Sequence, residues 1–146
     1  MTAETILNLA NYSKNIVGVK EASGNLPQIM HIIKDAPSHF QVISGDDALA
    51  LPMVLLGGAG VISVLANSQP DLVSAMIRSA LKGDLVSARK LHYGLLDMMD
   101  ALFAEGSPAG VKAALKHLGI CEDVVRLPLV SASDKLSQHI AKLLKN

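Results

Sequence analysis

The stretch Asn15-Ile-Val-Gly-Val-Lys-Glu-Ala-Ser-Gly24 decides the fold, because a short apolar run delivers a single lysine, Lys20, to its own end. The run over residues 16–20 predicts a buried strand, and the small residues after it predict a turn. In parallel α/β proteins the carboxyl ends of the strands carry the binding and catalytic side chains. The stretch therefore predicts a parallel α/β fold with Lys20 at the end of the sheet where such sites lie.

Strands and helices alternate on both sides of this stretch. The first half of the chain predicts helices over residues 2–12, 26–34 and 48–56, and further strands over residues 40–44 and 60–65. The second half predicts only helices, over residues 70–82, 85–102 and 108–118 and from Ser133 onward. Strands that are apolar almost throughout imply a parallel sheet that is covered on both faces.

The predicted fold class is therefore α/β. A complete (β/α)8 TIM barrel usually takes about 250 residues, whereas this chain has 146. We expect residues 1–83 to form the last three parallel strands of such a barrel with their helices, and residues 84–146 to form a C-terminal helical extension. Three strands leave two open sheet edges, which favours self-association or pairing with a missing N-terminal half.

Composition and charge exclude several classes of protein. The 13 basic and 13 acidic residues balance, and four aromatic side chains (two Tyr, two Phe, no Trp) leave little with which to bind nucleic acid. The uncharged residues 48–70 are interrupted by Pro52 and by Gly57, Gly58 and Gly60, so we expect no membrane span. The start of the chain lacks the features of a signal peptide. Cys121 is the only cysteine, which excludes an intrachain disulfide and favours a cytoplasmic protein.

Lys20 is the candidate nucleophile of the chain. Alternation along the strand places Ile16, Gly18 and Lys20 on one face, and Gly18 leaves room beside the amine. Enclosure disfavours the charged ammonium, so an enclosed lysine presents a free amine that can condense with a ketone to a Schiff base. The alternative is a strand-ending lysine that is solvated or paired with Glu21.

Two further strand ends carry small or polar residues. Gly45, in Ser44-Gly-Asp-Asp47, would let the backbone approach a small substrate closely. The two aspartates stand just before a helix and are interpreted as helix caps in preference to acid–base groups. In Ile62-Ser63 only one of the two side chains can face the interior of a barrel, and no histidine lies nearby in the sequence to activate Ser63 as a nucleophile.

Metal binding has no support in the sequence. The five histidines show no metal-ligand spacing with one another or with Cys121. We expect them to lie at the surface or to be hydrogen-bonded; they are His31, His39, His92, His117 and His139.

Five motifs in order resemble one known family. Gly18-Val-Lys-Glu-Ala-Ser-Gly-Asn25 resembles the Schiff-base lysine motif of the dihydrodipicolinate synthase (4-hydroxy-tetrahydrodipicolinate synthase) family of class I pyruvate-dependent aldolases. Ile43-Ser-Gly-Asp-Asp47 and Gly57-Gly-Ala-Gly-Val-Ile-Ser-Val64 are similar to its next two strands. Phe103-Ala-Glu-Gly-Ser-Pro-Ala-Gly-Val-Lys112 and Arg126-Leu-Pro-Leu129 are similar to its C-terminal helical region. The resemblance covers essentially the whole chain.

The resemblance implies a reaction and a set of site residues. Members of the family condense pyruvate, held as an imine on the motif lysine, with L-aspartate-4-semialdehyde in lysine and diaminopimelate biosynthesis. By this resemblance Lys20 would be the catalytic nucleophile, and Gly45 and Ile62 would bind pyruvate, chiefly through their backbone. The resemblance implies no cofactor or metal and a homo-oligomer, in which Leu26 and Leu56 either contribute to the subunit contacts or are ordinary core residues.

The chain lacks other parts of the family pattern. The threonine pair, the tyrosines of the proton relay and the arginine for the second substrate belong to the family's N-terminal half, and Tyr12 and Tyr93 fall on predicted helices instead. General acid–base catalysis is typically worth about 10²–10⁴-fold in rate. We therefore expect the chain alone to be inactive as a synthase. The alternatives are a lyase of the N-acetylneuraminate type and a non-catalytic, self-associating half-barrel scaffold.

Overall fold

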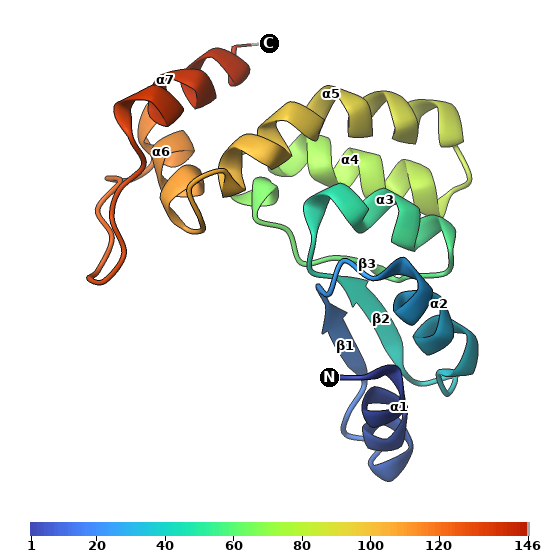
Figure 1. The fold of residues 1–146 in the computed structure, drawn as a ribbon. Helices are drawn as coiled ribbons and strands as arrows, with labels where there is room; N and C mark the ends of the chain where they lie inside the picture. The colour runs from blue at the N-terminus through green and yellow to red at the C-terminus, as the bar shows by residue number, and fades with distance from the viewer. Residues whose placement is uncertain (146) are drawn as a thin grey trace.

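Three parallel strands in the order β1-β2-β3 form the sheet (Figure 1). The computed structural model describes residues 1–145, and its strands span Gly18–Glu21, Gln41–Ser44 and Gly60–Val61. The register pairs Lys20 with Ile43 in β2, and Ile43 with Gly60 in β3. The expected parallel α/β sheet is confirmed, and Lys20 lies in the last half of its strand.

Seven α-helices and one 3-10 helix accompany the sheet in residues 1–145. They are α1 (Ala3–Tyr12), α2 (Leu26–Asp35), α3 (Asp47–Leu55), η1 (Leu65–Asn67), α4 (Pro70–Leu81), α5 (Leu85–Phe103), α6 (Ala109–His117) and α7 (Asp134–Leu143). The expected caps Asn25, Asp84 and Ser133 each accept a hydrogen bond from a backbone N–H in the first turn of their helix. The helix boundaries therefore follow closely from local side-chain chemistry.

One face of the sheet packs against helices α1, α2 and α3. Val42 of β2 lies in a buried cluster with Ile29 and Ile32 of α2 and Met53 of α3, and Val19 of β1 packs against the same cluster. Because side chains alternate along a strand, Lys20 and Ile43 point to the opposite side. We call this opposite side, which bears Lys20, Ile43 and Gly60, the open face.

The C-terminal helices form a second buried cluster. It joins Met76 of α4, Leu102 of α5, Ala114 of α6 and Ile140 of α7, and Figure 1 shows α6 and α7 beyond the end of α5. The expected boundary between residues 83 and 84 falls in the turn from α4 to α5, and buried residues on both sides of it belong to the same cluster. The division into two domains there stays a prediction.

The third strand is shorter than expected. It pairs only at Gly60 and Val61, and residues 65–67 form η1 instead of continuing the strand to Leu65. Two buried features explain the early end: the Asp47 carboxylate accepts hydrogen bonds from the N–H groups of Val64 and Leu65, and the Ser63 hydroxyl accepts one from Ala66 N–H. These amide groups therefore turn away from the neighbouring strand.

Two smaller expectations concern Ile16 and the uncharged residues 48–70. Ile16 does not share the face of Lys20, because β1 begins only at Gly18, and Ile16 packs against the cluster of α1 and α2. The uncharged residues 48–70 divide into α3, β3 and η1, as the breakers indicated. Within residues 1–145, no helix is both long enough and apolar enough to cross a membrane.

His92 departs from the expected surface or hydrogen-bonded histidine. Its side chain on α5 is buried, and its Nδ1 has no hydrogen-bond partner. Burial disfavours the charged imidazolium and lowers the pKa of His92. The face of α5 that carries Ala88 and Leu95 thus includes one polar group held in its neutral form.

Gly110 allows α6 to approach α5 closely. A Cβ at position 110 would collide with the backbone of Leu102, including its carbonyl oxygen. We expect Gly110→Ala to destabilise the fold by about 1–3 kcal/mol, because backbone must move to admit the methyl group. Gly94→Ala is the matched control, since a Cβ there meets nothing within 4 Å and alanine favours a helix by about 1 kcal/mol over glycine. Urea unfolding measures both, and equal effects would contradict the close approach.

The stability of the fold should depend on pH through His92. Since the folded state lowers the pKa of His92, the unfolded chain binds the proton more readily below its own pKa of about 6.5. The free energy of unfolding should therefore fall as the pH is lowered through about 6.5, and His92→Leu should reduce this fall. The exposed His31 provides the control variant His31→Leu. Equal pH profiles of the two variants, from denaturant unfolding between pH 5 and 8, would contradict the assignment to His92.

Candidate active site

Lys20 projects from the open face of β1. Its side chain is exposed in this chain, so the expectation of an enclosed amine is wrong for the chain by itself. The physical reason is that α1, α2 and α3 pack on the opposite face of the sheet. The alternative of an ion pair with Glu21 is also wrong. Glu21 alternates to the helix side, is buried, and accepts a hydrogen bond on Oε1 from Ser23 N–H at 2.7 Å.

Gly45 lies directly against the Lys20 side chain. A Cβ at position 45 would lie 2.8 Å from Lys20 Cε and 2.9 Å from Lys20 Cγ, which is closer than nonbonded carbons approach. The Gly45 N–H donates to the Glu21 carbonyl oxygen at 2.8 Å, so the end of β1 and the end of β2 are tied together. The structure thus brings two of the three expected site residues into contact, and glycine is favoured because the lysine stem and the Ala22 Cβ, 2.8 Å from a Cβ at position 45, fill the space beside it.

Ile62 follows the last paired residue of β3. Its N–H donates to the Ser44 carbonyl oxygen at 2.8 Å, which places its backbone next to Gly45. Its side chain is half exposed, at 49%. The neighbouring Ser63 uses its hydroxyl to accept from Ala66 N–H at 2.8 Å. Ile62 therefore adjoins the segment that contacts Lys20, whereas the Ser63 hydroxyl serves the turn into η1.

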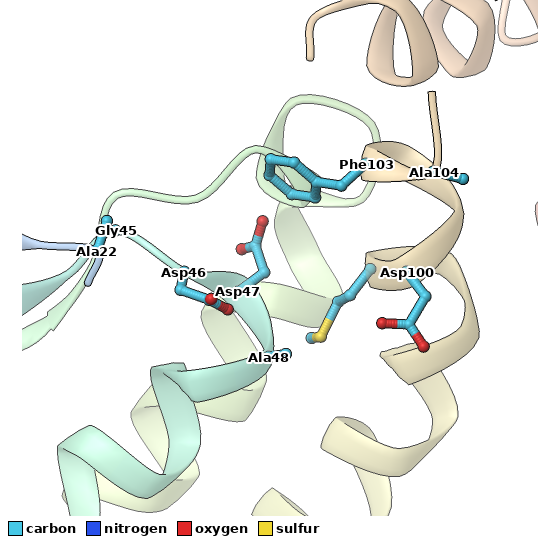
Figure 2. Close-up of a pocket in the computed structure, with 9 residues that line it drawn as sticks. Ala22, Gly45, Asp46, Asp47, Ala48, Asp100, Phe103 and Ala104 are labelled. Carbon is cyan, nitrogen blue, oxygen red and sulfur yellow. The ribbon is translucent and has the colours of Figure 1, made fainter. Parts of the chain in front are cut away.

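A cavity of about 450 Å³ opens beside Gly45 (Figure 2). It extends from the ends of β1 and β2 to the last turn of α5. The contribution of α5 was not expected from the sequence, although the Phe103 motif marks the end of this helix. The lining residues are Ala22, Gly45, Asp46, Asp47, Ala48, Met99, Asp100, Phe103 and Ala104.

The three carboxylates in this cavity have different roles. Asp46 caps α3 as expected, because its Oδ1 accepts from Leu49 N–H at 3.2 Å. Asp47 is not a helix cap: it is only 3% exposed, and its Oδ2 accepts from both Val64 N–H and Leu65 N–H at 3.0 Å each. Asp100 is exposed on α5. The capping interpretation of the pair is thus confirmed for Asp46 and wrong for Asp47, whose amide partners lie 17 and 18 residues away in the sequence.

The chain matches the dihydrodipicolinate synthetase family over residues 1–146. It is 46% identical over 140 residues to the 4-hydroxy-tetrahydrodipicolinate synthase of Flavobacterium psychrophilum, covering 96% of this chain and 48% of the relative. The corresponding protein of Neisseria meningitidis serogroup B is 49% identical over 145 residues, covering 99% of this chain and 50% of the relative. The chain therefore spans about half the length of these curated relatives.

Solved structures agree with the sequence comparison. Dihydrodipicolinate synthase from Aquifex aeolicus superimposes with a TM-score of 0.95 at 43% identity, over 99% of this chain and 49% of that chain. The enzyme from Thermotoga maritima gives a TM-score of 0.96 at 38% identity, over 99% and 50%. The chloride-inhibited enzyme from Acinetobacter baumannii, complexed with pyruvate, gives 0.93 at 33% identity, over 99% and 49%. Matched along its whole length in sequence and structure, the chain belongs to the dihydrodipicolinate synthetase family.

Proposed function

We propose that Lys20 is the nucleophile of a Schiff-base lyase and forms an imine with pyruvate. The observation that carries the proposal is the contact of the Lys20 stem with Gly45 at the adjoining ends of β1 and β2. This contact directs the amine along the open face, where a small keto acid can approach it. Gly45 and Ile62 supply the backbone that would bind the carboxylate and carbonyl oxygens of pyruvate.

The chemistry starts at the Lys20 amine nitrogen. Lys20 Nζ attacks the C2 carbonyl carbon of pyruvate, and water leaves as the imine forms. The protonated imine draws electrons from C3, so loss of a C3 proton gives an enamine that attacks an aldehyde carbon. With L-aspartate-4-semialdehyde as the aldehyde, its oxygen takes up a proton, and its own amino group then attacks the imine carbon, closes the ring and displaces the Lys20 amine, which gives 4-hydroxy-tetrahydrodipicolinate. The names of the relatives support this aldehyde, and the pyruvate complex of the Acinetobacter enzyme supports the keto acid.

Proton transfer is the step for which the described residues supply the fewest candidate groups. Tyr12 on α1 and Tyr93 on α5 are both exposed, and neither lines the cavity beside Gly45. We therefore propose that the chain alone forms the imine but turns over slowly. Efficient synthesis would need groups from a homo-oligomeric partner or from a further half of the barrel placed over the open face. A sialic-acid type of aldolase would use the same imine with a different aldehyde.

Borohydride trapping tests the nucleophile. Incubation with pyruvate and borohydride should add one reduced pyruvate adduct, and peptide mapping should place it on Lys20. The variant Lys20→Ala should lose the adduct, whereas Lys14→Ala should retain it, because Lys14 is exposed but lies outside the site. An adduct that is spread over several lysines, or that survives Lys20→Ala, would sink the proposal. A folded chain with no adduct would favour a non-catalytic scaffold.

The same preparation tests turnover. With pyruvate and L-aspartate-4-semialdehyde, we expect a rate at least about 100-fold below that of a full-length relative, because positioned acid–base groups typically contribute 10²–10⁴-fold. Turnover at the full-length rate would overturn the statement about proton transfer while leaving the imine intact. Trapping and turnover therefore report on separate parts of the proposal.

Gly45→Ala should slow trapping without unfolding the protein. The added Cβ would lie 2.8 Å from both Lys20 Cε and the Ala22 Cβ, so the lysine stem must rotate away and the backbone near Gly45 or Ala22 must shift. We expect a loss of about ten- to a hundredfold in the rate of adduct formation, as for other misplaced reacting groups. Gly94→Ala, remote on α5, controls for the added methyl group. An unchanged trapping rate in Gly45→Ala would show that the contact with Lys20 does not matter.

A further inference from the structure

The backbone that carries Ile62 is secured almost entirely from outside β3. We refer to residues 62–65 as the β3 loop and to residues 44–47 as the β2–α3 segment. The ladder between β2 and β3 ends at Val61, and Ile62 N–H makes one further bond to the Ser44 carbonyl oxygen. Beyond Ile62 the amide groups of Val64 and Leu65 turn to a single acceptor, Asp47 Oδ2, at 3.0 Å each. Ile62 is thus placed between two anchors, both of which belong to the β2–α3 segment.

Asp47 is built to hold these two amides. Its side chain is 3% exposed, and the amide-bearing Leu65 is fully buried. Within residues 1–145 no cation forms a salt bridge with Asp47, so its charge is compensated by backbone N–H groups. Hydrogen bonds from N–H groups to a carboxylate are stronger than neutral ones, and its place at the start of α3 adds the favourable end of the helix dipole.

The same segment also contacts the nucleophile. Gly45, two residues before Asp47, lies against the Lys20 stem, and its N–H is bonded to Glu21 in the strand of Lys20. The Ser44 hydroxyl fixes the bend between them, because it donates to the Asp46 carbonyl oxygen at 2.7 Å and accepts from Asp46 N–H. The β2–α3 segment therefore connects the Lys20 stem to the β3 loop: Gly45 contacts the stem at one end, and Asp47 accepts from the loop amides at the other.

We propose that Asp47 is a positioning residue for the imine site: its carboxylate anchors the β3 loop so that the Ile62 backbone stands at a fixed place relative to Lys20. The inference rests on the proposed function, because it gives Ile62 a place in pyruvate binding. Asp47 itself does not touch the reacting atoms. It acts only by holding the Ile62 backbone in place, so any side chain that accepts hydrogen bonds from both amides in the same way would serve as well.

The test compares two variants of the 146-residue chain. Asp47→Ala removes both hydrogen bonds, whereas Asp47→Asn keeps an oxygen in the same place without the charge. Asp84→Ala is the matched control, because Asp84 caps α5 through Ser87 N–H and does not line the cavity beside Gly45. Each is examined by borohydride trapping over a range of pyruvate concentrations and by hydrogen exchange at the Val64 and Leu65 amides.

Positioning predicts a specific pattern of results. In Asp47→Ala the two amides should lose protection, and the half-saturating pyruvate concentration should rise about ten- to a hundredfold, as expected for a misplaced binding group. Asp47→Asn should keep both the protection and the trapping curve within about threefold of the parent chain. Asp84→Ala should leave the trapping curve unchanged and lower only the stability of the fold.

Three results would overturn the inference. The first is unchanged amide protection in Asp47→Ala, and the second is an unchanged pyruvate curve after protection has been lost. The third is loss of trapping in Asp47→Asn with its amides still protected, because the charge would then act on the substrate directly; this arm decides the case if Asp47→Ala does not fold. Failure of the parent chain to trap pyruvate would instead refute the proposed function, and amide exchange alone would then decide whether Asp47 anchors the loop.

Discussion

The candidate site depends on one constraint, because a single four-residue segment at the end of β2 holds the ends of β1 and β3. Within residues 44–47, the Gly45 N–H donates to the Glu21 carbonyl oxygen, the Ser44 carbonyl oxygen accepts from Ile62 N–H, and the Asp47 carboxylate accepts from Val64 N–H and Leu65 N–H. Parallel strands place their carboxyl ends at one edge of the sheet, but the ladder alone leaves the residues beyond the last pair free. The segment orders the backbone beyond the last ladder pair, and it thereby fixes which residues lie next to Lys20.

Much of the fold could be predicted because its causes are local. The caps at Asn25, Asp84 and Ser133 determine where their helices begin through hydrogen bonds within the first turn. The mostly apolar runs over residues 16–20 and 40–44 indicate the parallel strands in the same local way. The contact of Gly45 with Lys20 was also within reach, because the position of Lys20 and the turn after β2 both follow from strand boundaries. What local patterns predict well is where an element begins and which side chain stands at its end.

The errors arose where distant groups compete for the backbone. The end of β3 could not be predicted from its β-branched residues, because a carboxylate 17 residues earlier removes Val64 N–H from the ladder. For the same reason Asp47, which fits a capping pattern as well as Asp46 does, has a different role. The exposure of Lys20 depends on which face of the sheet the helices cover, and the burial of His92 depends on which helices pack against α5. Such features require the tertiary arrangement, which spacing in the sequence does not contain.

The positions of the candidate site residues and the exclusion of water from them are two separate properties of this structure. The hydrogen bonds that order the backbone of Gly45 and Ile62 are made within residues 1–65, and the Lys20 stem lies against Gly45. The buried cluster between the sheet and its helices supports this arrangement from the side opposite the open face. Exclusion of water is not complete, since Lys20 and half of the Ile62 side chain are exposed. Electrostatic interactions that stabilise a transition state are strong only in a site from which water is excluded. Under the proposed function, forming the imine depends mainly on placement, whereas joining two carbon skeletons also depends on enclosure, so we expect this half of the fold to support the first step more than the second.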